Sequence, residues 1–258
     1  MQNLYLGTIG FSYDFWKGSF YPPNTDSKDY LRYYASKFNT VEVDSTFYRI
    51  PSEQTVTNWK HQTPKGFKFA LKFPRLITHM KKLKDCQNET RVFLQRANLL
   101  EEKLGPLLLQ FPPNFTIDHL PDLVDYLEDL PKTSRYVVEV RDKSWLKTVF
   151  YSVLRTYGVA LAWSDSQLSL HTSEVTADFL YMRWEGDRKK VNGTLGKIEN
   201  DKQTDLNNWA VKLRSFLDKQ MNVFGYFGKY YSGFPPSDAA YLQANLGIKV
   251  FGSQNKFR

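Results

Sequence analysis

The chain has 258 residues, of which 41% are apolar and 24% are charged, and it holds no low-complexity tract. This composition is typical of a folded globular protein with a sizeable core and excludes a disordered or fibrous one. The formal charge of +8 favours anionic partners, such as nucleic acid, phosphorylated metabolites or a membrane surface, without choosing among them.

Features that would direct the chain to a membrane or an oxidising compartment are missing from the sequence. No apolar run approaches the roughly 18 residues that a membrane span requires, and Met1 leads almost directly into a strand-like segment. The single Cys86 has no second cysteine with which to form a disulfide or a metal site. We therefore expect a cytoplasmic protein without a secretory signal and without a membrane partner.

Short apolar runs alternate with stretches of helical spacing along the whole chain. The apolar runs predict strands over residues 4–10, 40–46, 67–73, 106–111, 136–141, 158–164, 179–185 and 222–228. The other stretches predict helices over residues 27–38, 52–62, 85–103, 118–129, 143–156, 167–177, 203–220 and 236–246. Helical crossovers imply parallel pairing, and eight such units in about 250 residues are what a closed barrel requires. The sequence predicts an α/β fold, a TIM-type (β/α)8 barrel of eight parallel strands that forms a single domain over residues 1–258.

The main alternative is an open doubly wound sheet, which shows the same alternation of strands and helices. No Gly-x-Gly-x-x-Gly motif follows the first predicted strand, and the P-loop, His-Glu-x-x-His and Gly-x-Ser-x-Gly patterns do not occur in the sequence. The chain therefore carries no motif for a nucleotide cofactor.

Charged and hydrogen-bonding residues recur at the downstream ends of the predicted strands, although a strand buried on both faces should be apolar. In a parallel barrel these ends surround the mouth, where ligands bind. Side chains alternate along a strand, so Val41 and Val43 suit the helix layer and leave Glu42 and Asp44 pointing inward. The same test, applied to the other strands, directs these residues to the mouth: Lys72, Gln110, Glu139, Arg141, Arg183 and Glu185, with Asp165 at the end of the sixth strand.

Buried charges are costly unless they are paired, so this convergence indicates a functional pocket, with a purely structural ion-pair network as the alternative. The carboxylates suit Mg²⁺ or Mn²⁺, or acid and base catalysis; they belong to Glu42, Asp44, Glu139 and Asp165. The cations suit a phosphate or carboxylate; they belong to Lys72, Arg75, Arg141 and Arg183. His79 lies just past the third strand and is the best placed of the four histidines. No His and Cys cluster has the spacing of a zinc site.

The segment 186–202 follows the seventh predicted strand and is loop-like by its Gly and Asn content. Its position places it on the functional face. The sequence leaves three interpretations open, namely a mobile lid, an anion clamp or a solvated surface loop.

Several motifs, in order along nearly the full length, resemble the YecE-like family, domain of unknown function 72. They are Gly7-Thr8-Ile9-Gly10-Phe11-Ser12-Tyr13 with Trp16, Val41-Glu42-Val43-Asp44-Ser45-Thr46-Phe47-Tyr48, Lys72-Phe73-Pro74 with Thr78-His79, Leu109-Gln110-Phe111-Pro112-Pro113, Val138-Glu139-Val140-Arg141 with Trp145, and Tyr181-Met182-Arg183. The resemblance implies a barrel of eight parallel strands and no established activity.

Two segments depart from the family pattern. The family usually has Phe-Asn-Asn near the eighth strand, whereas this chain has Phe227-Gly228-Lys229. The family often has an Arg followed by His-Gly, whereas this chain has Arg183-Trp184-Glu185-Gly186. The resemblance therefore supports the intact blocks, around Glu42, Thr46, Tyr48, Lys72, His79, Glu139, Arg141 and Trp145.

The first functional hypothesis is an enzyme, a hydrolase or lyase, that acts on a phosphorylated or other anionic substrate. Glu42 or Glu139 would be the acid or base, and cations would stabilise negative charge. The expected catalytic residues are Glu42, Glu139, Lys72 and His79. The expected substrate-binding residues are Tyr13, Trp16, Asp44, Thr46, Tyr48, Arg75, Gln110, Arg141, Trp145, Asp165 and Arg183. No residue is assigned to a metal, and a divalent cation, Mg²⁺ or Mn²⁺, is the one cofactor left open.

The second hypothesis is a nucleic-acid or nucleotide binding protein that stacks bases on an aromatic and basic platform. The charge of +8 fits this hypothesis, but no RNA- or DNA-binding motif occurs in the sequence. The third is an accessory protein that binds a small anion without catalysis.

Overall fold

The computed structural model describes residues 3–166, 170 and 172–247. These residues form nine strands, and every strand pair is parallel. The strands are β1 (Leu4–Thr8), β2 (Thr40–Val43), β3 (Lys68–Lys72), β4 (Leu104–Gln110), β5 (Tyr136–Glu139), β6 (Ala160–Leu161), β7 (Trp163–Ser166), β8 (Phe179–Gly186) and β9 (Asn222–Tyr230).

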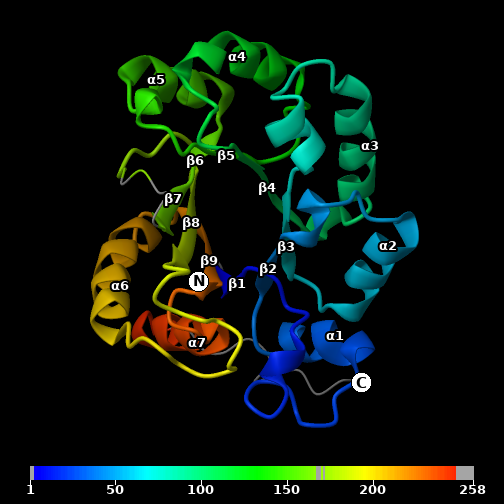
Figure 1. Cartoon of the computed structure of the whole chain (residues 1–258), viewed down its shortest axis with the longest axis vertical. Helices are drawn as coiled ribbons and strands as arrows, with labels where there is room; N and C mark the ends of the chain where they lie inside the picture. The colour runs from blue at the N-terminus through cyan, green and yellow to red at the C-terminus, as the bar shows by residue number, and fades with distance from the viewer. Residues whose placement is uncertain (1–2, 167–169, 171, 248–258) are drawn as a thin grey trace.

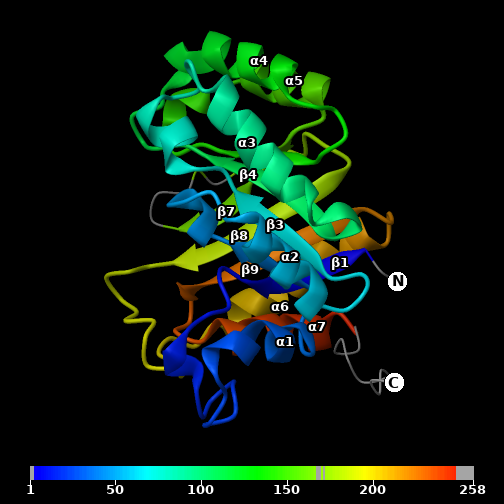
Figure 2. The same cartoon turned by 90° about the vertical axis from the view of Figure 1, so that its right-hand side faces the viewer.

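The α-helices follow one another around the outside of the strands (Figure 1). They are α1 (Tyr30–Ala35), α2 (Glu53–Gln62), α3 (Gln87–Asn98), α4 (Leu120–Asp129), α5 (Thr148–Tyr157), α6 (Gln203–Leu217) and α7 (Pro235–Asn245). In the view turned by 90°, α4 and α5 lie at one end of the molecule and α1, α6 and α7 at the other, with strands between them (Figure 2).

Helix boundaries follow local signals in the sequence. The side chain of Ser52 caps α2 by accepting a hydrogen bond from the N–H of Thr55 at 3.2 Å. Pro121 lies in the first turn of α4, where its missing N–H costs nothing. Gly158 ends α5 in the left-handed conformation, with φ of +64°, which glycine adopts without strain.

The strands form two sheets, with the orders β1-β9-β8-β7 and β2-β3-β4-β5-β6. On one side, Ile9, just past the end of β1, forms an isolated parallel bridge with Glu42 of β2. On the other side, only Ala162 separates β6, which pairs with β5, from β7, which pairs with β8. The chain therefore passes directly from the five-stranded sheet into the four-stranded one at Ala162.

Gly7 sits at the contact between β1 and β2. A Cβ at this position would lie 2.1 Å from the carbonyl oxygen of Thr40 and 2.6 Å from the hydroxyl of Tyr34. That hydroxyl accepts a hydrogen bond from the N–H of Thr8 and donates one to Thr40, so it bridges the two strands. Only glycine permits so close an approach.

The strands present alternate side chains to two different layers. One set, which includes Val41 and Val43, packs in the large apolar core beneath the helices. The other set forms a second buried cluster, to which β3, β4 and β5 contribute Ala70, Leu108 and Val137, and β8 and β9 contribute Phe179, Tyr181, Phe224 and Tyr226. Both sheets therefore contribute side chains to one buried cluster.

The structure confirms the α/β class and the parallel pairing. The strands nevertheless form two sheets of four and five, rather than one continuous eight-stranded sheet. The strand predicted over 158–164 is divided because its first half pairs with β5 and its second half with β8. The predicted order of strands and helices otherwise agrees with the described elements, within a few residues at each end.

The helix predicted over 167–177 is wrong for residues 170 and 172–177, which have no helical structure; residues 167–169 and 171 lie outside the described part of the chain. Hydrogen bonds to residues 159–163 hold this segment in place. The Thr176 hydroxyl accepts from the N–H of Leu161 and donates to the carbonyl of Val159. The indole of Trp163 donates to the carbonyl of Glu174 at 2.8 Å.

Candidate functional site

Arg183 is the centre of a buried network of charges at the carboxyl ends of the strands. Its side chain extends from β8 and is 3% exposed. Its Nε and Nη2 donate to the two carboxylate oxygens of Glu42, each at 2.9 Å, and its Nη1 donates to Oε2 of Glu139 at 2.6 Å. Glu42 comes from β2 and Glu139 from β5, so one guanidinium group links the two sheets.

Further donors complete this network. The Tyr181 hydroxyl donates to Glu42 at 2.8 Å, and the amide of Gln110 donates to Glu139 at 2.8 Å. Arg183 also donates to Glu185, and Arg141 contacts Glu139 at 3.3 Å and Glu185 at 3.5 Å. The buried carboxylates therefore have the several hydrogen bonds that burial of a charge requires.

The network keeps its charges at neutral pH. Burial by itself would raise the pKa of the Glu139 carboxyl, but Arg183 and Arg141 outweigh burial and lower this pKa to about 2. Burial acts to lower the pKa of Arg183, but the surrounding glutamates raise it well above its ordinary value. Glu139 is thus an anion near pH 7 and is poorly matched to exchanging a proton there.

A cavity of about 320 Å³ opens beside this network. It brings together residues that the sequence predicts for the site: Tyr13, Asp44, Tyr48, Lys72, Arg75, His79, Gln110, Arg141 and Arg183. These residues lie in or after β1, β2, β3, β4, β5 and β8, so both sheets contribute to its wall. Alternation along the strands predicts five of these residues, namely Asp44, Lys72, Gln110, Arg141 and Arg183, and Glu42 and Glu139 are bonded to Arg183.

Lys72 ends β3 and is 8% exposed. Its Nζ lies 3.9 Å from the centre of the Phe47 ring, and the Thr46 hydroxyl donates to its backbone carbonyl at 2.7 Å. Burial and the nearby Arg183 lower the pKa of the Lys72 amine to about 8, although the glutamates act in the opposite direction. Lys72 is consequently the amine in this cavity whose protonation changes near neutral pH.

His79 borders the same cavity, within the π-helical turn Leu76–Met80. Its Nδ1 lies 2.9 Å from the Thr78 hydroxyl, and its ring contacts the edge of Phe47. Burial, followed by the charges of Lys72 and Arg141, lowers the pKa of His79 to about 4. The imidazole is therefore neutral at pH 7 and adds no positive charge to the cavity.

Four of the predicted residues have other places in the structure. Trp16 and Trp145 are fully buried beneath the loops that carry Tyr13 and Arg141, so they do not wall the cavity. The Thr46 hydroxyl hydrogen-bonds to the carbonyls of Val43 and Lys72. The Trp145 indole donates to the carbonyl of Phe115, and the Trp16 ring packs against the Tyr13 ring, so these three residues support the loops of the site.

Asp165 lies at a different cavity, between β7 and α6, together with Trp163, Lys202 and Lys212. It shares the parity of Trp163, whose ring faces Lys212 of α6 at 4.5 Å. The position of Asp165 in the predicted site is therefore corrected: alternation along β7 turns it toward the helix layer and away from the mouth.

Other cavity residues were missing from the predicted set. Phe47, Arg188, Lys229 and Tyr230 line the cavity, and Tyr181 hydrogen-bonds to its acidic floor. Arg188 comes from the loop after β8. This loop belongs to the segment 186–202, for which the sequence allows a lid, an anion clamp or a surface loop. Lys229 belongs to the segment that departs from the family pattern. Alternation along β9 would have indicated the inner face of that strand, but a loop residue such as Arg188 has no periodic signal.

The carboxylates of the network do not fit a divalent cation in this arrangement. Carboxylate oxygens of Glu42, Glu139 and Glu185 all accept hydrogen bonds from Arg183, whose guanidinium occupies the point on which they converge. Within residues 3–166, 170 and 172–247, no group of three or more His, Cys, Asp or Glu side chains is arranged to hold a metal ion. We therefore assign no step to Mg²⁺ or Mn²⁺.

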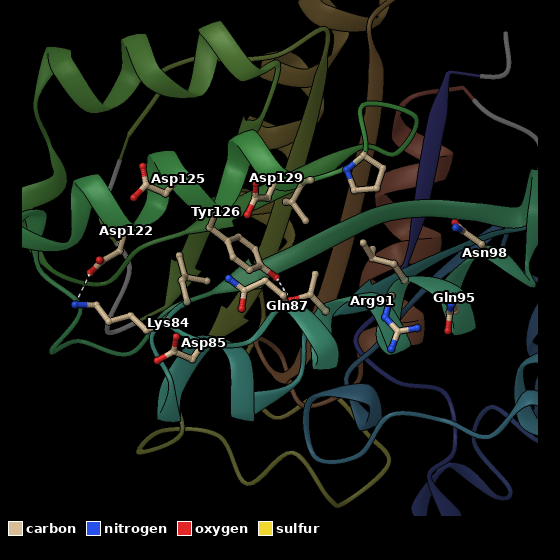
Figure 3. A pocket seen from close by; sticks show the side chains of 15 residues that line it. Lys84, Asp85, Gln87, Arg91, Gln95, Asn98, Asp122, Asp125, Tyr126 and Asp129 are labelled. Atoms are coloured by element: carbon tan, nitrogen blue, oxygen red, sulfur yellow. Dashed lines mark hydrogen bonds and ion pairs between the residues drawn. The ribbon is translucent and has the colours of Figure 1, made fainter.

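A larger groove, of about 620 Å³, lies between α3 and α4. Figure 3 shows Asp122, Asp125 and Asp129 of α4 on one side and residues of α3 such as Arg91 on the other. An ion pair of 3.4 Å joins Lys84 to Asp122 across it. None of the residues predicted for the site lines this groove. The groove is the larger of the two, but the charged cavity holds the predicted residues and is therefore the better candidate for a functional site.

Together, these features define an α/β protein of parallel strands with a charged cavity at the strand ends. A family model described as "Protein of unknown function DUF72" matches residues 5–256. The chain belongs to this family, which confirms the resemblance seen in its motifs.

Curated relatives share parts of the chain. It is 39% identical to UPF0759 protein YecE of Escherichia coli (strain K12) over 111 residues, which cover 43% of this chain and 41% of that protein. It is 29% identical to UPF0759 protein YunF of Bacillus subtilis (strain 168) over 177 residues, which cover 63% of this chain and 59% of that protein. The matched regions thus span less than two thirds of the length of these relatives.

Solved structures agree over almost the whole chain. A DUF72 family protein from Thermotoga maritima has a TM-score of 0.74 and 26% identity, covering 95% of this chain and 99% of that one. One from Enterococcus faecalis has a TM-score of 0.72 and 20% identity, covering 95% and 98%, and shows the likeness of fold alone. Separately, none of the described helices combines the length and apolarity needed to span a bilayer.

Proposed function

We propose that this protein binds a small anionic ligand, a phosphorylated compound or a carboxylate, in the charged cavity, and that it acts on this ligand as a hydrolase or lyase. The observation that carries the proposal is the excess of cations. Among the described residues, four cavity cations have no carboxylate within ion-pair distance, namely Lys72, Arg75, Arg188 and Lys229. Their charges are available to a ligand.

We also propose that the two sheets close into one barrel. The bridge from Ile9 to Glu42 and the direct passage from β6 to β7 support a barrel in which β6 and β7 act as one of eight strands. The interior cluster shared by both sheets supports the same arrangement. In such a barrel the loops after the strands form the binding face, which is where the charged cavity lies.

The roles of the proposed catalytic residues follow from their contacts. Glu42 and Glu139 are committed to Arg183, so they hold the guanidinium and shape the floor of the cavity. Lys72 and His79 are the cavity groups free to exchange protons, since the pKa of Lys72 is about 8 and His79 is neutral at pH 7. The cations would stabilise negative charge that develops on the ligand.

Titration calorimetry with inorganic phosphate at pH 7 tests the binding part of the proposal. We expect Arg75→Ala and Lys229→Ala each to weaken binding about tenfold, because each removes a hydrogen bond to a charged group. The matched control is Lys212→Ala, which removes an exposed lysine of α6 that lies outside the charged cavity. Phosphate binding that is absent, or unaffected by the cavity variants, would contradict the proposal. Turnover against phosphomonoesters and phosphodiesters then tests the hydrolase.

One observation favours nucleic-acid binding as a second candidate function. Tyr48 is 79% exposed at the cavity, next to the Phe47 ring, and unpaired cations lie nearby. An exposed ring beside cations is the arrangement that stacks single-stranded bases. Labelled oligonucleotides, titrated at two salt concentrations, test this alternative: salt-dependent binding that Tyr48→Ala weakens would support it, and no binding at low salt would remove it.

A further inference from the structure

Lys72 is the one cavity lysine that is both buried and without a counterion. It is 8% exposed, and its Nζ faces the Phe47 ring at 3.9 Å. In the part of the chain that the structure describes, this Nζ has neither a hydrogen-bond acceptor nor an ion-pair partner. A buried lysine is normally paired, so this arrangement is energetically costly and calls for a reason.

The acidic floor does not neutralise Lys72, because other groups already hold it. Glu42 accepts two hydrogen bonds from Arg183 and one from Tyr181. Glu139 accepts from Arg183, Gln110 and Arg141. Arg183 is the charge that acts against the ammonium form of Lys72, and the glutamates of the floor offset it only in part.

Burial and neighbouring cations together make an amine nucleophilic. With a pKa of about 8, about a tenth of Lys72 is the neutral amine at pH 7, which is about 300 times the fraction for an ordinary lysine. Lysines activated in this way attack carbonyl carbons and form imines. The cavity, of about 320 Å³, has the size of a site for a small molecule.

The other cavity cations define what else the ligand carries. Arg75, Arg188 and Lys229 border the same cavity and are without carboxylate partners within the described residues. They suit a phosphate or carboxylate on a molecule whose reactive carbon lies against Lys72. Phe47 covers the ammonium on one side and leaves the cavity side open for approach.

We infer that Lys72 is a nucleophile that forms an imine with a small aldehyde or ketone bearing a phosphate or carboxylate group. This inference rests on the proposed anion-binding function and names the substrate class for a lyase. The neutral amine of Lys72 forms a bond from Nζ to the carbonyl carbon, and the displaced electron pair of the C=O bond becomes an alkoxide. One proton passes from nitrogen to that oxygen. A second proton from nitrogen leaves with the hydroxyl as water, and a C=N bond results.

His79 is suited to assist these proton transfers. Its imidazole borders the same cavity and is neutral at pH 7, because burial and the charge of Lys72 lower its pKa to about 4. A neutral imidazole accepts the proton that nitrogen loses and returns it to oxygen. The hydrogen bond between Thr78 and Nδ1 leaves Nε2 available for this exchange.

Reductive trapping tests the inference. The full chain is incubated with glycolaldehyde phosphate or glyoxylate and treated with borohydride, which reduces an imine to a stable secondary amine. Mass spectrometry of the intact protein and of its peptides then locates the label. We expect one predominant label, on Lys72, with a pH midpoint near 8 rather than near 10.5, and far weaker labelling by glycolaldehyde, which lacks the anionic group.

Two variants provide the controls. Lys72→Arg keeps the charge and cannot form an imine, so it should lose the label. Lys212→Met removes an exposed lysine that also faces an aromatic ring, at 4.5 Å from the centre of Trp163, and it should label as the native chain does. Thermal denaturation checks that both variants fold.

The outcomes separate this inference from the proposed function. If the native chain binds phosphate but labels Lys72 no more than its surface lysines, the imine is overturned and anion binding stands. If neither phosphate binding nor labelling occurs, the proposed function fails with it. Labelling of Lys72 that is equal with glycolaldehyde and its phosphate would refute the anionic substrate class.

Discussion

Replacement of Arg183 by methionine removes the cation on which the buried network depends. The variant keeps a side chain of similar length but leaves Glu42, which is fully buried, and Glu139, which is 3% exposed, without their main partner. Breaking a buried ion pair in this way costs about 3–5 kcal/mol, because the remaining charge has no compensation. For a chain of this size, that corresponds to a melting temperature lower by roughly 6–20 °C.

Urea and thermal denaturation at pH 7 measure this loss. Arg188→Met is the matched control, since it removes an arginine from the same cavity whose guanidinium is exposed and rests on the Tyr230 ring at 5.1 Å. The control should change the free energy of unfolding by less than about 0.5 kcal/mol. Adding Glu139→Gln to Arg183→Met should recover part of the loss, because it removes one of the stranded charges.

The pH dependence of stability should also change. In the native chain the pKa of Glu139 is lowered from 4.5 to about 2, so its contribution is complete above pH 4.5 and is lost as pH falls toward 2. Without Arg183, burial becomes the dominant influence on this carboxyl, and the variant should gain stability as pH falls from 7 to 5. A variant that matches the Arg188→Met control in stability and in pH profile would refute the view that Arg183 holds the two sheets together.

Three further predictions concern other parts of the molecule. Gly7→Ala should destabilise the chain by about 2 kcal/mol or more in urea denaturation, because its Cβ would lie 2.1 Å from the Thr40 carbonyl oxygen; an unchanged midpoint would contradict this contact. Burial raises the pKa of Asp238 to about 7, despite its hydrogen bond from Ser232, so its contribution to stability is complete below pH 3.8 and is lost as pH rises through 7. Asp238→Asn should therefore be more stable than the native chain at pH 8, by calorimetric melting, and a native-like melting curve at that pH would argue against it. Phosphate binding should weaken as pH rises through about 8, as Lys72 loses its charge, and Lys72→Arg should abolish that step in calorimetric titrations; a step that persists would assign the titration to another group.

Alternation along the strands predicts several residues of the site. The predictions that differ from the structure have physical causes. Parity along β2, β5 and β8 places Glu42, Glu139 and Arg183 inside, because the period of a strand does not depend on its neighbours. The same rule applied to Asp165 would have turned it toward α6, together with Trp163. Trp16 and Trp145 belong to loops, which have no period, so the sequence does not distinguish a ring that walls a cavity from one that supports it.

The amino-acid sequence by itself determines the order of elements, the parallel pairing that helical crossovers require, and which strand residues share an inner face. These properties depend on local periodicity and on turn chemistry, both of which are determined by residues close together in the sequence. Only the tertiary structure decides which charges pair. Arg183 lies more than a hundred residues from Glu42 along the chain, yet it binds both carboxylate oxygens of Glu42. Glu42 therefore forms its ion pair with Arg183 and not with Lys72. The pKa values of Lys72 and Glu139 depend on that choice of partners, because a charge responds to what surrounds it in space.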